Sequence, residues 1–236
     1  MRKSSNPPIA QSFNRSILRI GIFGGTFNPV HLGHLRSAEE VRETQGFDRI
    51  LFIPSATPPH KQADGLASAA HRFAMVRMAI AGNPYFRASA MEIERGGRSF
   101  SVDTLLALRA RLPRARFAFI LGIDAFREIA TWKNYRSIFA LCDVVVTSRP
   151  PVRAAALRAA IPVAVRSEFC YRPKSRTLEH RTGNQIIFQR LSDLDISASA
   201  LRDRLLRGLS IRYLVPTSVE RYIARQGLYA AQVGSH

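Results

Sequence analysis

The strongest restriction on the fold is an alternation of short apolar runs with longer amphipathic runs, which starts near residue 17. The apolar runs are rich in Val, Ile, Leu and Phe, as is typical of strands buried on both faces. The predicted strands are 18–23, 49–54, 86–93, 116–121, 143–147 and 185–190. The predicted helices between them are 35–44, 68–81, 102–112, 125–130 and 135–140. This alternation predicts a doubly wound, Rossmann-like α/β fold, with a parallel sheet and helices on both faces.

Domain boundaries are predicted where the alternation starts and stops. Residues 1–16 are polar and include two prolines, so we expect a flexible N-terminal tail. The α/β domain follows over 17–192, and within it the segment 151–184 loses the rhythm and is interpreted as an insertion or loop. Residues 193–236 form a small C-terminal helical part, in which the helices are predicted at 198–207 and 216–226.

Composition excludes several protein classes. With 236 residues and 46% hydrophobic content, the chain has enough material for a large core and is not expected to be disordered. It has neither an apolar run long enough to span a bilayer nor the apolar core of a signal peptide. Its two cysteines, Cys142 and Cys170, have no metal-site spacing. We expect a soluble, cytoplasmic protein without a membrane partner, and the sequence leaves homo-oligomer formation open.

The formal net charge of +18 raises the question of a nucleic-acid partner. A basic surface attracts any polyanion, and nucleotides are polyanions too. The arginines are scattered along predicted helices and loops, whereas nucleic-acid binders more often gather them in a stripe with interleaved aromatic residues. The pattern argues against nucleic acid as the main partner, and a basic nucleic-acid-binding protein on the same scaffold remains the alternative from another class.

A glycine pair after the first predicted strand marks a ligand site. Gly24 and Gly25 allow a sharp turn in which no Cβ blocks a ligand, and ligands of open α/β sheets bind at the carboxyl ends of strands. The segment lacks the Gly-Lys-Ser/Thr of a Walker A loop and the GxGxxG dinucleotide pattern. A phosphate group at this turn must therefore be bound by another kind of motif.

Two histidines supply that motif. His31 and His34 are three residues apart at the first turn of the next helix, so both imidazoles lie on one side beside free backbone amides. Both rings can donate to phosphate oxygens, and the helix terminus adds partial positive charge. The histidines could also be cap and packing residues or two metal ligands. No third ligand occurs at helical spacing, which argues against the metal.

A second signal lies near the C-terminus. Ile196 precedes Ser197 and Ser199, either of which can cap a helix, and Arg202 follows about one turn inside it. Arginine presents a planar fork of donors that suits phosphate, although an isolated pattern of this kind is more often a capped helix with a solvated arginine.

In this order, Gly24–His34 and the segment from Ile196 to Arg202 resemble the HxGH and ISxSxxR motifs of the nucleotidyltransferase superfamily. That superfamily includes adenylyltransferases and cytidylyltransferases and is related to class I aminoacyl-tRNA synthetases. The resemblance implies that His31, His34 and Arg202 are catalytic and contact the triphosphate of the nucleotide. The ATP-binding residues that it implies are Gly24, Gly25, Thr26, Phe27, Gly122, Asp124, Ile196, Ser197 and Ser199.

Four middle segments resemble the nicotinate-nucleotide adenylyltransferase family. They are Ile53-Pro54-Ser55-Ala56-Thr57-Pro58-Pro59-His60-Lys61, Arg98-Ser99-Phe100-Ser101-Val102-Asp103-Thr104-Leu105, Phe119-Ile120-Leu121-Gly122-Ile123-Asp124 with Thr131-Trp132-Lys133, and Val144-Val145-Val146-Thr147-Ser148-Arg149-Pro150. Family members often have Tyr and Thr at the positions of Phe100 and Ser101, so no phenolic hydroxyl does essential work at Phe100. The resemblance covers roughly 18–229 and is poorest over 151–184.

The resemblance implies where nicotinate mononucleotide binds. Thr104 lies against the nicotinate carboxylate, Trp132 stacks on the pyridine with the Lys133 backbone nearby, and Arg149 binds the phosphate. His60 and Lys61 present further donors to a phosphate. A lone tryptophan is otherwise more often a packing residue, and a proline-rich turn such as the one before His60 is common.

The expected reaction transfers AMP from ATP to nicotinate mononucleotide, giving deamido-NAD and pyrophosphate in NAD biosynthesis. The acceptor phosphate attacks the α-phosphorus in line, without a covalent intermediate, because a phosphate monoester is already an anionic nucleophile. Mg²⁺ is expected on the ATP phosphates, and no protein metal ligand is predicted. Alternatives within the superfamily are adenylyl transfer to nicotinamide mononucleotide or phosphopantetheine, and cytidylyl transfer.

Overall fold

A computed structural model describes residues 17–58, 65–148, 159, 161–175 and 177–230 of the chain. Four of the expectations from the sequence fall outside these ranges. They are the N-terminal tail over 1–16, the His60–Lys61 pair, Arg149, and the first part of the segment 151–184.

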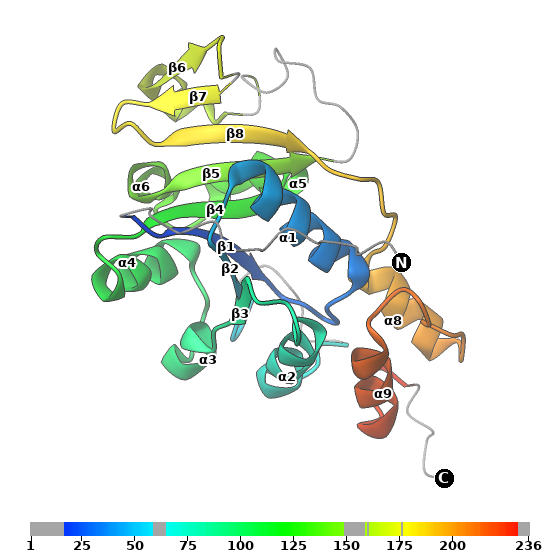
Figure 1. Ribbon diagram of the computed structural model, residues 1–236. Coiled ribbons are helices and arrows are strands. Elements are labelled where there is room, and N and C mark those ends of the chain that lie inside the picture. The colour runs from blue at the N-terminus through cyan, green and yellow to red at the C-terminus, as the bar shows by residue number, and fades with distance from the viewer. Residues whose placement is uncertain (1–16, 59–64, 149–158, 160, 176, 231–236) are drawn as a thin grey trace, which may run out of the picture.

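One 8-stranded sheet forms the centre of the molecule, with the strand order β3-β2-β1-β4-β5-β8-β7-β6 (Figure 1). The strands are β1 Arg19–Gly25, β2 Arg49–Pro54, β3 Phe86–Ala88, β4 Arg116–Gly122, β5 Asp143–Ser148, β6 Phe169–Arg172, β7 Thr177–His180 and β8 Gln185–Arg190. Pairing is parallel from β3 to β8, while β7 and β6 are antiparallel additions at one edge. The predicted Rossmann-like α/β fold is confirmed.

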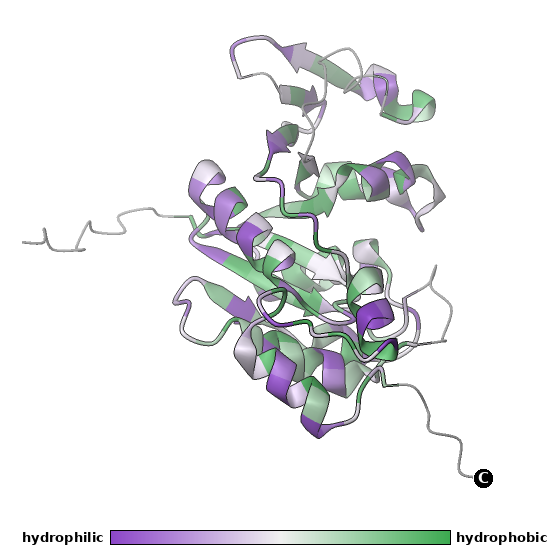
Figure 2. Cartoon of the chain, turned by 90° about the vertical axis from the view of Figure 1, so that its right-hand side faces the viewer, coloured by the Kyte–Doolittle hydropathy of each residue, from purple (hydrophilic) through white to green (hydrophobic). Residues whose placement is uncertain are grey.

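Helices cover both faces of the sheet. One hydrophobic cluster holds side chains from α4, α5 and α6, and the other holds side chains from α1, α2, α8 and α9. Figure 2 shows apolar residues concentrated on the strands and polar residues on the outer sides of the helices. The helices are α1 Leu32–Gln45, α2 Ala69–Ala79, α3 Met91–Arg95, α4 Ser101–Arg111, α5 Ile123–Arg127, η1 Ile129–Thr131, α6 Tyr135–Leu141, η2 Val163–Glu168, α8 Ala198–Leu206 and α9 Thr217–Arg225.

The strand order creates a switch point between β1 and β4. The chain runs outward from β1 to β2 and β3, then returns to place β4 on the other side of β1 and β5 beyond it. Connections on either side of this point diverge, which leaves a crevice at the carboxyl ends of the two strands. Gly25 ends β1 and Gly122 ends β4, so the predicted phosphate turn lies at this crevice.

The prediction of a strand over 86–93 is wrong for the second half of that range. Only Phe86–Ala88 pairs with β2, and Met91–Arg95 forms the short helix α3. Gly96, with a φ of 70°, donates to the carbonyls of Glu92 and Ile93 and ends the helix in a way that favours glycine. The apolar residues of this run are too few to distinguish a strand from a buried helical turn.

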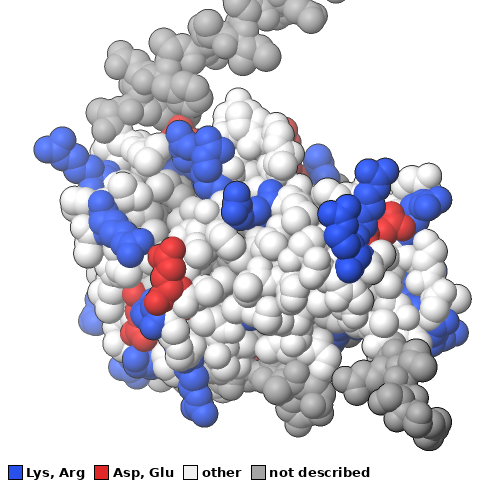
Figure 3. Space-filling model, turned by 90° about the horizontal axis from the view of Figure 1, so that it is seen from below, with Lys and Arg blue, Asp and Glu red and all other residues white. Residues whose placement is uncertain are grey.

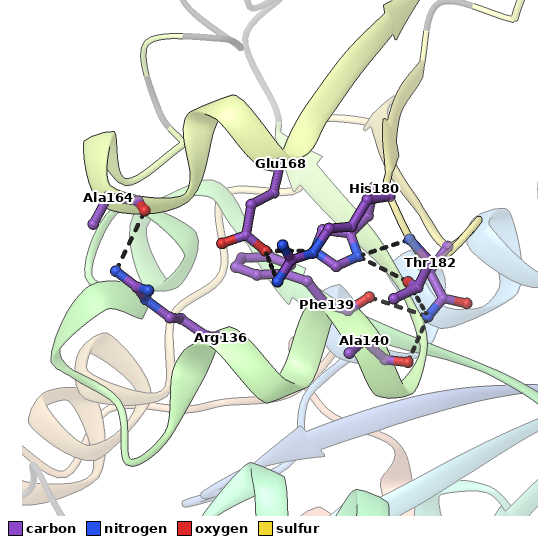
Figure 4. Close-up of polar contacts among 9 residues, drawn as sticks. Arg136, Phe139, Ala140, Ala164, Glu168, His180 and Thr182 are labelled. Atoms are coloured by element: carbon purple, nitrogen blue, oxygen red, sulfur yellow. Dashed lines mark hydrogen bonds and ion pairs between the residues drawn. The ribbon is translucent and has the colours of Figure 1, made fainter.

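The segment predicted as an insertion contains a β-hairpin over part of its length. β6 and β7 extend the sheet beyond β8, and Asn184 Nδ2 donates to the carbonyls of Phe139 and Ala140 at the end of α6 at 3.0 and 2.9 Å (Figure 4). Buried His180 contacts Glu168 at 3.1 Å and Thr182 at 2.8 Å. The Asn184 bonds attach the hairpin to α6 of the α/β core, and the His180 bonds hold the hairpin to η2 and to its own turn.

Charged side chains are spread over the face of the molecule that is seen from below. In the view from below, Lys and Arg side chains form separate groups with a few acidic residues between them (Figure 3). Within the described ranges, no helix is long and apolar enough to cross a membrane.

Candidate active site

A cavity of about 430 Å³ lies at the carboxyl ends of β1 and β4. Its walls come from the turn after β1, α1, the loop after β2, α3, α4, β4, the α5–η1 segment and the start of α8. The residues predicted from the sequence that line it are Gly24, Gly25, Thr26, Phe27, His34, Thr104, Gly122, Trp132 and Lys133. Part of the predicted nucleotide set and part of the predicted acceptor set therefore line one cavity.

The histidine pair has a defined geometry. His31 is the N-cap of α1, and its ring stacks on the ring of His34 with centroids 3.6 Å apart. His34 Nδ1 accepts the backbone N–H of His31 at 3.2 Å. A neutral imidazole that accepts at Nδ1 has its proton on Nε2. His34, which lines the cavity, can thus donate from Nε2. His31 is 5% exposed, and its ring stacks on the ring of His34.

The second signature meets the first at this cavity. Ser197 caps α8 by accepting the N–H of Ala200 at 3.2 Å, as predicted. A Cβ placed on Gly33 would lie 3.7 Å from Cβ of Ile196, so the N-termini of α1 and α8 are neighbours. Arg202 donates from Nη1 to the carbonyl of Asn28 at 2.9 Å. Two helix N-termini and one guanidinium therefore gather at the turn after β1, an arrangement that suits phosphate.

The turn itself is supported by side chains that sequence reasoning missed. Arg72, only 1% exposed, donates to the carbonyls of Thr26 and Ala56, both at 2.8 Å. Burial lowers the pKa of Arg72 from its ordinary value. Asn28 Oδ1 accepts from the hydroxyl of Tyr229 at 2.6 Å. No local pattern marks these residues, because their partners are distant in the sequence.

The opposite end of the cavity is aromatic. Trp132 packs edge-on against Phe119 with centroids 6.1 Å apart, and Phe100 forms another part of the wall. The Lys133 ammonium lies 3.0 Å from Asp103 and 4.8 Å from the centre of the Phe100 ring. A flat heterocycle fits between such groups, since aromatic rings pack well edge-on and offset.

Thr104 lies at this end with a partner that the sequence did not suggest. Its hydroxyl donates to Glu92 Oε1 at 2.6 Å, and both residues are buried and line the cavity. Burial raises the pKa of Glu92, an effect partly opposed by hydrogen bonds from Thr104 and Ser99 and by the charge of Arg95. Glu92 was missed because we predicted its segment as a strand.

Several predicted residues do not line the cavity. Asp124 is exposed, pairs with Arg127 at 3.2 Å and is not part of the cavity lining. The others within the described ranges are His31, Ile196, Ser197, Ser199 and Arg202, which surround the turn from behind and beside it. His60, Lys61 and Arg149 are outside the described residues.

Gly33 provides a test of the histidine geometry. An added Cβ would lie 3.0 Å from His31 Nδ1, so the ring would have to shift by a few tenths of an ångström. Alanine also favours the helix by up to ~1 kcal/mol relative to glycine. For Gly33→Ala we expect kcat to fall about tenfold with an unchanged or slightly raised melting temperature, because misplacing a catalytic group costs rate rather than stability.

The control for stability is Gly122→Ala, where an added Cβ meets nothing within 4 Å and the melting temperature should not change. Thermal unfolding is compared between the two variants, and steady-state turnover is compared between Gly33→Ala and the wild type, because Gly122 itself lines the cavity. An unchanged kcat in Gly33→Ala would contradict a role for the His31 ring position.

Comparisons with known proteins identify the family of the chain. Residues 22–204 match the family model described as cytidylyltransferase-like. The chain is 50% identical over 213 residues to a probable nicotinate-nucleotide adenylyltransferase of Geobacter sulfurreducens, covering 90% of this chain and 99% of the relative. A relative with the same description from Citrifermentans bemidjiense is 50% identical over 212 residues, covering 90% of this chain and 98% of the relative.

The solved Plasmodium falciparum nicotinic acid mononucleotide adenylyltransferase complexed with NaAD superposes with a TM-score of 0.69 at 17% identity. The match covers 90% of this chain and 97% of that one, and it shows a common fold. The sequence relatives, aligned over almost their full length, identify the family. The chain belongs to the nicotinate-nucleotide adenylyltransferase family.

Proposed function

We propose that the protein transfers AMP from ATP to nicotinate mononucleotide, giving deamido-NAD and pyrophosphate. The observation that carries this proposal is a single cavity with two different ends. One end holds His34 and the glycine turn, and the other holds Trp132 and Thr104. A cavity of this kind accommodates the phosphates of one substrate and the aromatic ring of the other, and the names of the curated relatives support the same assignment.

The nucleotide occupies the end beside β1 and β4. Its phosphates lie over the glycine turn, where His34 Nε2, Arg202 and the N-termini of α1 and α8 supply donors. We assign Asp124, which follows Gly122 and Ile123 at the end of β4, to a ribose hydroxyl. The full set of residues proposed for ATP is Gly24, Gly25, Thr26, Phe27, Gly122, Asp124, Ile196, Ser197 and Ser199, with His31, His34 and Arg202 at the reacting phosphates.

The acceptor occupies the aromatic end. Trp132 contacts the pyridine ring, Thr104 lies near its carboxylate, and the Lys133 backbone is nearby; all three residues line the cavity. The donors proposed for the acceptor phosphate are His60, Lys61 and Arg149.

The reaction needs no nucleophile from the protein. A phosphate oxygen of nicotinate mononucleotide attacks the α-phosphorus of ATP, the bond to the bridging oxygen breaks, and the electron pair leaves with pyrophosphate. The chain holds both anions in line and neutralises the leaving group with the His34 donor and the Arg202 guanidinium. Binding and orientation therefore supply most of the rate acceleration.

Mg²⁺ enters with ATP and offsets the charge of the triphosphate and of the departing pyrophosphate. Among the described residues, no group of three or more His, Cys, Asp or Glu side chains could hold a metal ion. The donors at the turn are histidines, amides and an arginine, which bind phosphate oxygens rather than magnesium. These residues fit a cation that is held by the nucleotide and by water.

An acceptor screen tests this function. The protein is incubated with [α-³²P]ATP, Mg²⁺ and, in separate reactions, nicotinate mononucleotide, nicotinamide mononucleotide, phosphopantetheine and no acceptor. We expect labelled dinucleotide mainly with nicotinate mononucleotide, released with an equal amount of pyrophosphate. Faster transfer to another acceptor would contradict the proposed substrate, and no pyrophosphate release with any acceptor would contradict the proposed reaction.

A further inference from the structure

The contact between Glu92 and Thr104 bears on how the cavity distinguishes a carboxylate from a carboxamide. Glu92 projects from α3 and is 7% exposed, and Thr104 on α4 is 1% exposed. The Thr104 hydroxyl donates to Glu92 Oε1 at 2.6 Å, and Ser99 also bonds to this carboxyl group. Both Glu92 and Thr104 line the aromatic end of the cavity.

The hydrogen bonds among Glu92, Thr104 and their neighbours determine which donors and acceptors this wall of the cavity presents to a ligand. An ionised carboxylate only accepts, so it takes the single hydroxyl proton of Thr104. Arg95 Nη2 donates to the same hydroxyl oxygen at 3.3 Å. Ser99 Oγ accepts the N–H of Ala56 at 2.9 Å, and its hydroxyl also lowers the pKa of Glu92. With Glu92 ionised, the Thr104 proton is directed at the carboxylate and not at a ligand.

The two pyridine substituents respond to this arrangement in opposite ways. A carboxylate has only acceptor atoms, so it would face the lone pairs of Thr104 and the nearby negative charge of Glu92. A carboxamide has an NH₂ group that can donate to Thr104 as it stands. If Glu92 carries a proton, its hydroxyl can donate to Thr104, whose own proton then turns toward the ligand.

We propose that Glu92 is a positioning residue that takes up one proton when the nicotinate carboxylate binds, and so directs the Thr104 hydroxyl toward that carboxylate. The proposal rests on the proposed function, in which the pyridine ring lies at this end of the cavity. Proton transfer is balanced, because one proton comes from solvent and one negative charge enters with the ligand. Selection between acid and amide then depends on a residue that need not touch the substrate.

The surroundings of Glu92 support this protonation. Burial is the largest influence on its pKa and raises it above the ordinary value. The charged groups on neighbouring elements are Arg95 on α3, Arg98 in the following loop and the Asp103–Lys133 pair, and Glu128 also lines the cavity. A bound carboxylate adds a further negative charge and raises the pKa again.

The sign of the pH dependence follows from linkage. The ligand-bound state holds one more proton than the free state once the pH exceeds the pKa of Glu92 in the free protein. The Kd for deamido-NAD should therefore rise with pH, at most about tenfold per unit for one proton. The Kd for NAD, which has a carboxamide, should stay flat over the same range. Neither dinucleotide has a phosphate monoester whose titration would interfere.

The test uses the whole chain and the fluorescence of Trp132, the only tryptophan in the sequence. Quenching is titrated with deamido-NAD and with NAD from pH 6 to 9. Calorimetry in two buffers of different ionisation enthalpy then measures proton uptake directly. We expect uptake approaching one proton for deamido-NAD and none for NAD at the alkaline end.

The Glu92→Gln variant tests the protonation of Glu92 separately from its packing, because glutamine has a similar shape but does not titrate. Its amide donates to Thr104 at every pH, so deamido-NAD binding should become independent of pH and tighter than wild type at pH 9. The matched control is Glu128→Gln, an exposed residue of the same cavity that should keep the wild-type dependence. If Glu92→Gln does not fold, the calorimetry of the wild type still decides.

A pH-independent Kd for deamido-NAD without proton uptake would overturn the proposal while leaving the proposed function intact. So would a Glu92→Gln variant that binds more weakly at every pH with an unchanged slope. Absence of any deamido-NAD binding would contradict both this inference and the proposed function.

Discussion

Replacement of His34 by alanine is expected to lower kcat by about 10²–10³-fold, the usual cost of removing one preorganised donor to a developing negative charge. His34 lines the cavity, and because its Nδ1 accepts the His31 backbone N–H, its Nε2–H remains to donate to the phosphate that we propose there. The half-buried ring packs edge-on against Phe23 and Phe27 and accepts that N–H, so its loss should also lower stability by about 1 kcal/mol. Steady-state kcat with saturating substrates and a thermal unfolding curve measure the two effects.

His71→Ala is the matched control. That ring lies on α2 and bonds to the Tyr222 hydroxyl at 2.9 Å, away from the cavity. It should leave kcat unchanged while lowering stability by about 1 kcal/mol for the lost hydrogen bond. Equal activity of His34→Ala and the wild type would contradict the assignment of His34 as the phosphate donor.

Arg202→Ala should have the second largest effect, lowering kcat by about 10²-fold. The guanidinium is held beside the turn by its bond to the Asn28 carbonyl, and the remaining donors of its planar fork can reach phosphate. Arg202→Lys keeps the charge but loses the fork, so it should recover only part of the rate. Single-turnover rates of AMP transfer would separate this effect from product release.

Arg207→Ala on the same helix is the comparison. Its side chain is exposed and pairs with Asp203 at 3.4 Å, an ion pair of the kind that contributes little. Turnover should match the wild type. If Arg202→Ala and Arg207→Ala behave alike, Arg202 is only a surface residue and the second signature has no catalytic role.

The sequence was informative where structure is set locally. The sequence predicted the parallel strands on either side of β1 because these strands are buried on both faces and are therefore continuous apolar runs. Ser197 and Ser199 were both recognised as possible helix caps for the same reason, since capping depends on the next three residues, and Ser197 is the one that caps α8.

The sequence was uninformative where the local structure depends on residues that are far away in the chain. The hairpin of β6 and β7 joins the sheet as antiparallel edge strands, and its short, partly polar strands have no strong pattern. The turn after β1 is supported by Arg72 and Tyr229, whose bonds span the chain. Glu92 belongs to the same class, because its partner Thr104 lies on another helix.

The most direct test of the account is a crystal structure with deamido-NAD bound. We predict the pyridine ring beside Trp132 with its carboxylate facing Thr104, and the adenosine phosphate within hydrogen-bond distance of His34 Nε2. Both halves of the dinucleotide would then occupy the one cavity at the carboxyl ends of β1 and β4. A nicotinate ring bound outside that cavity, or phosphates with no contact to His34, would contradict the account.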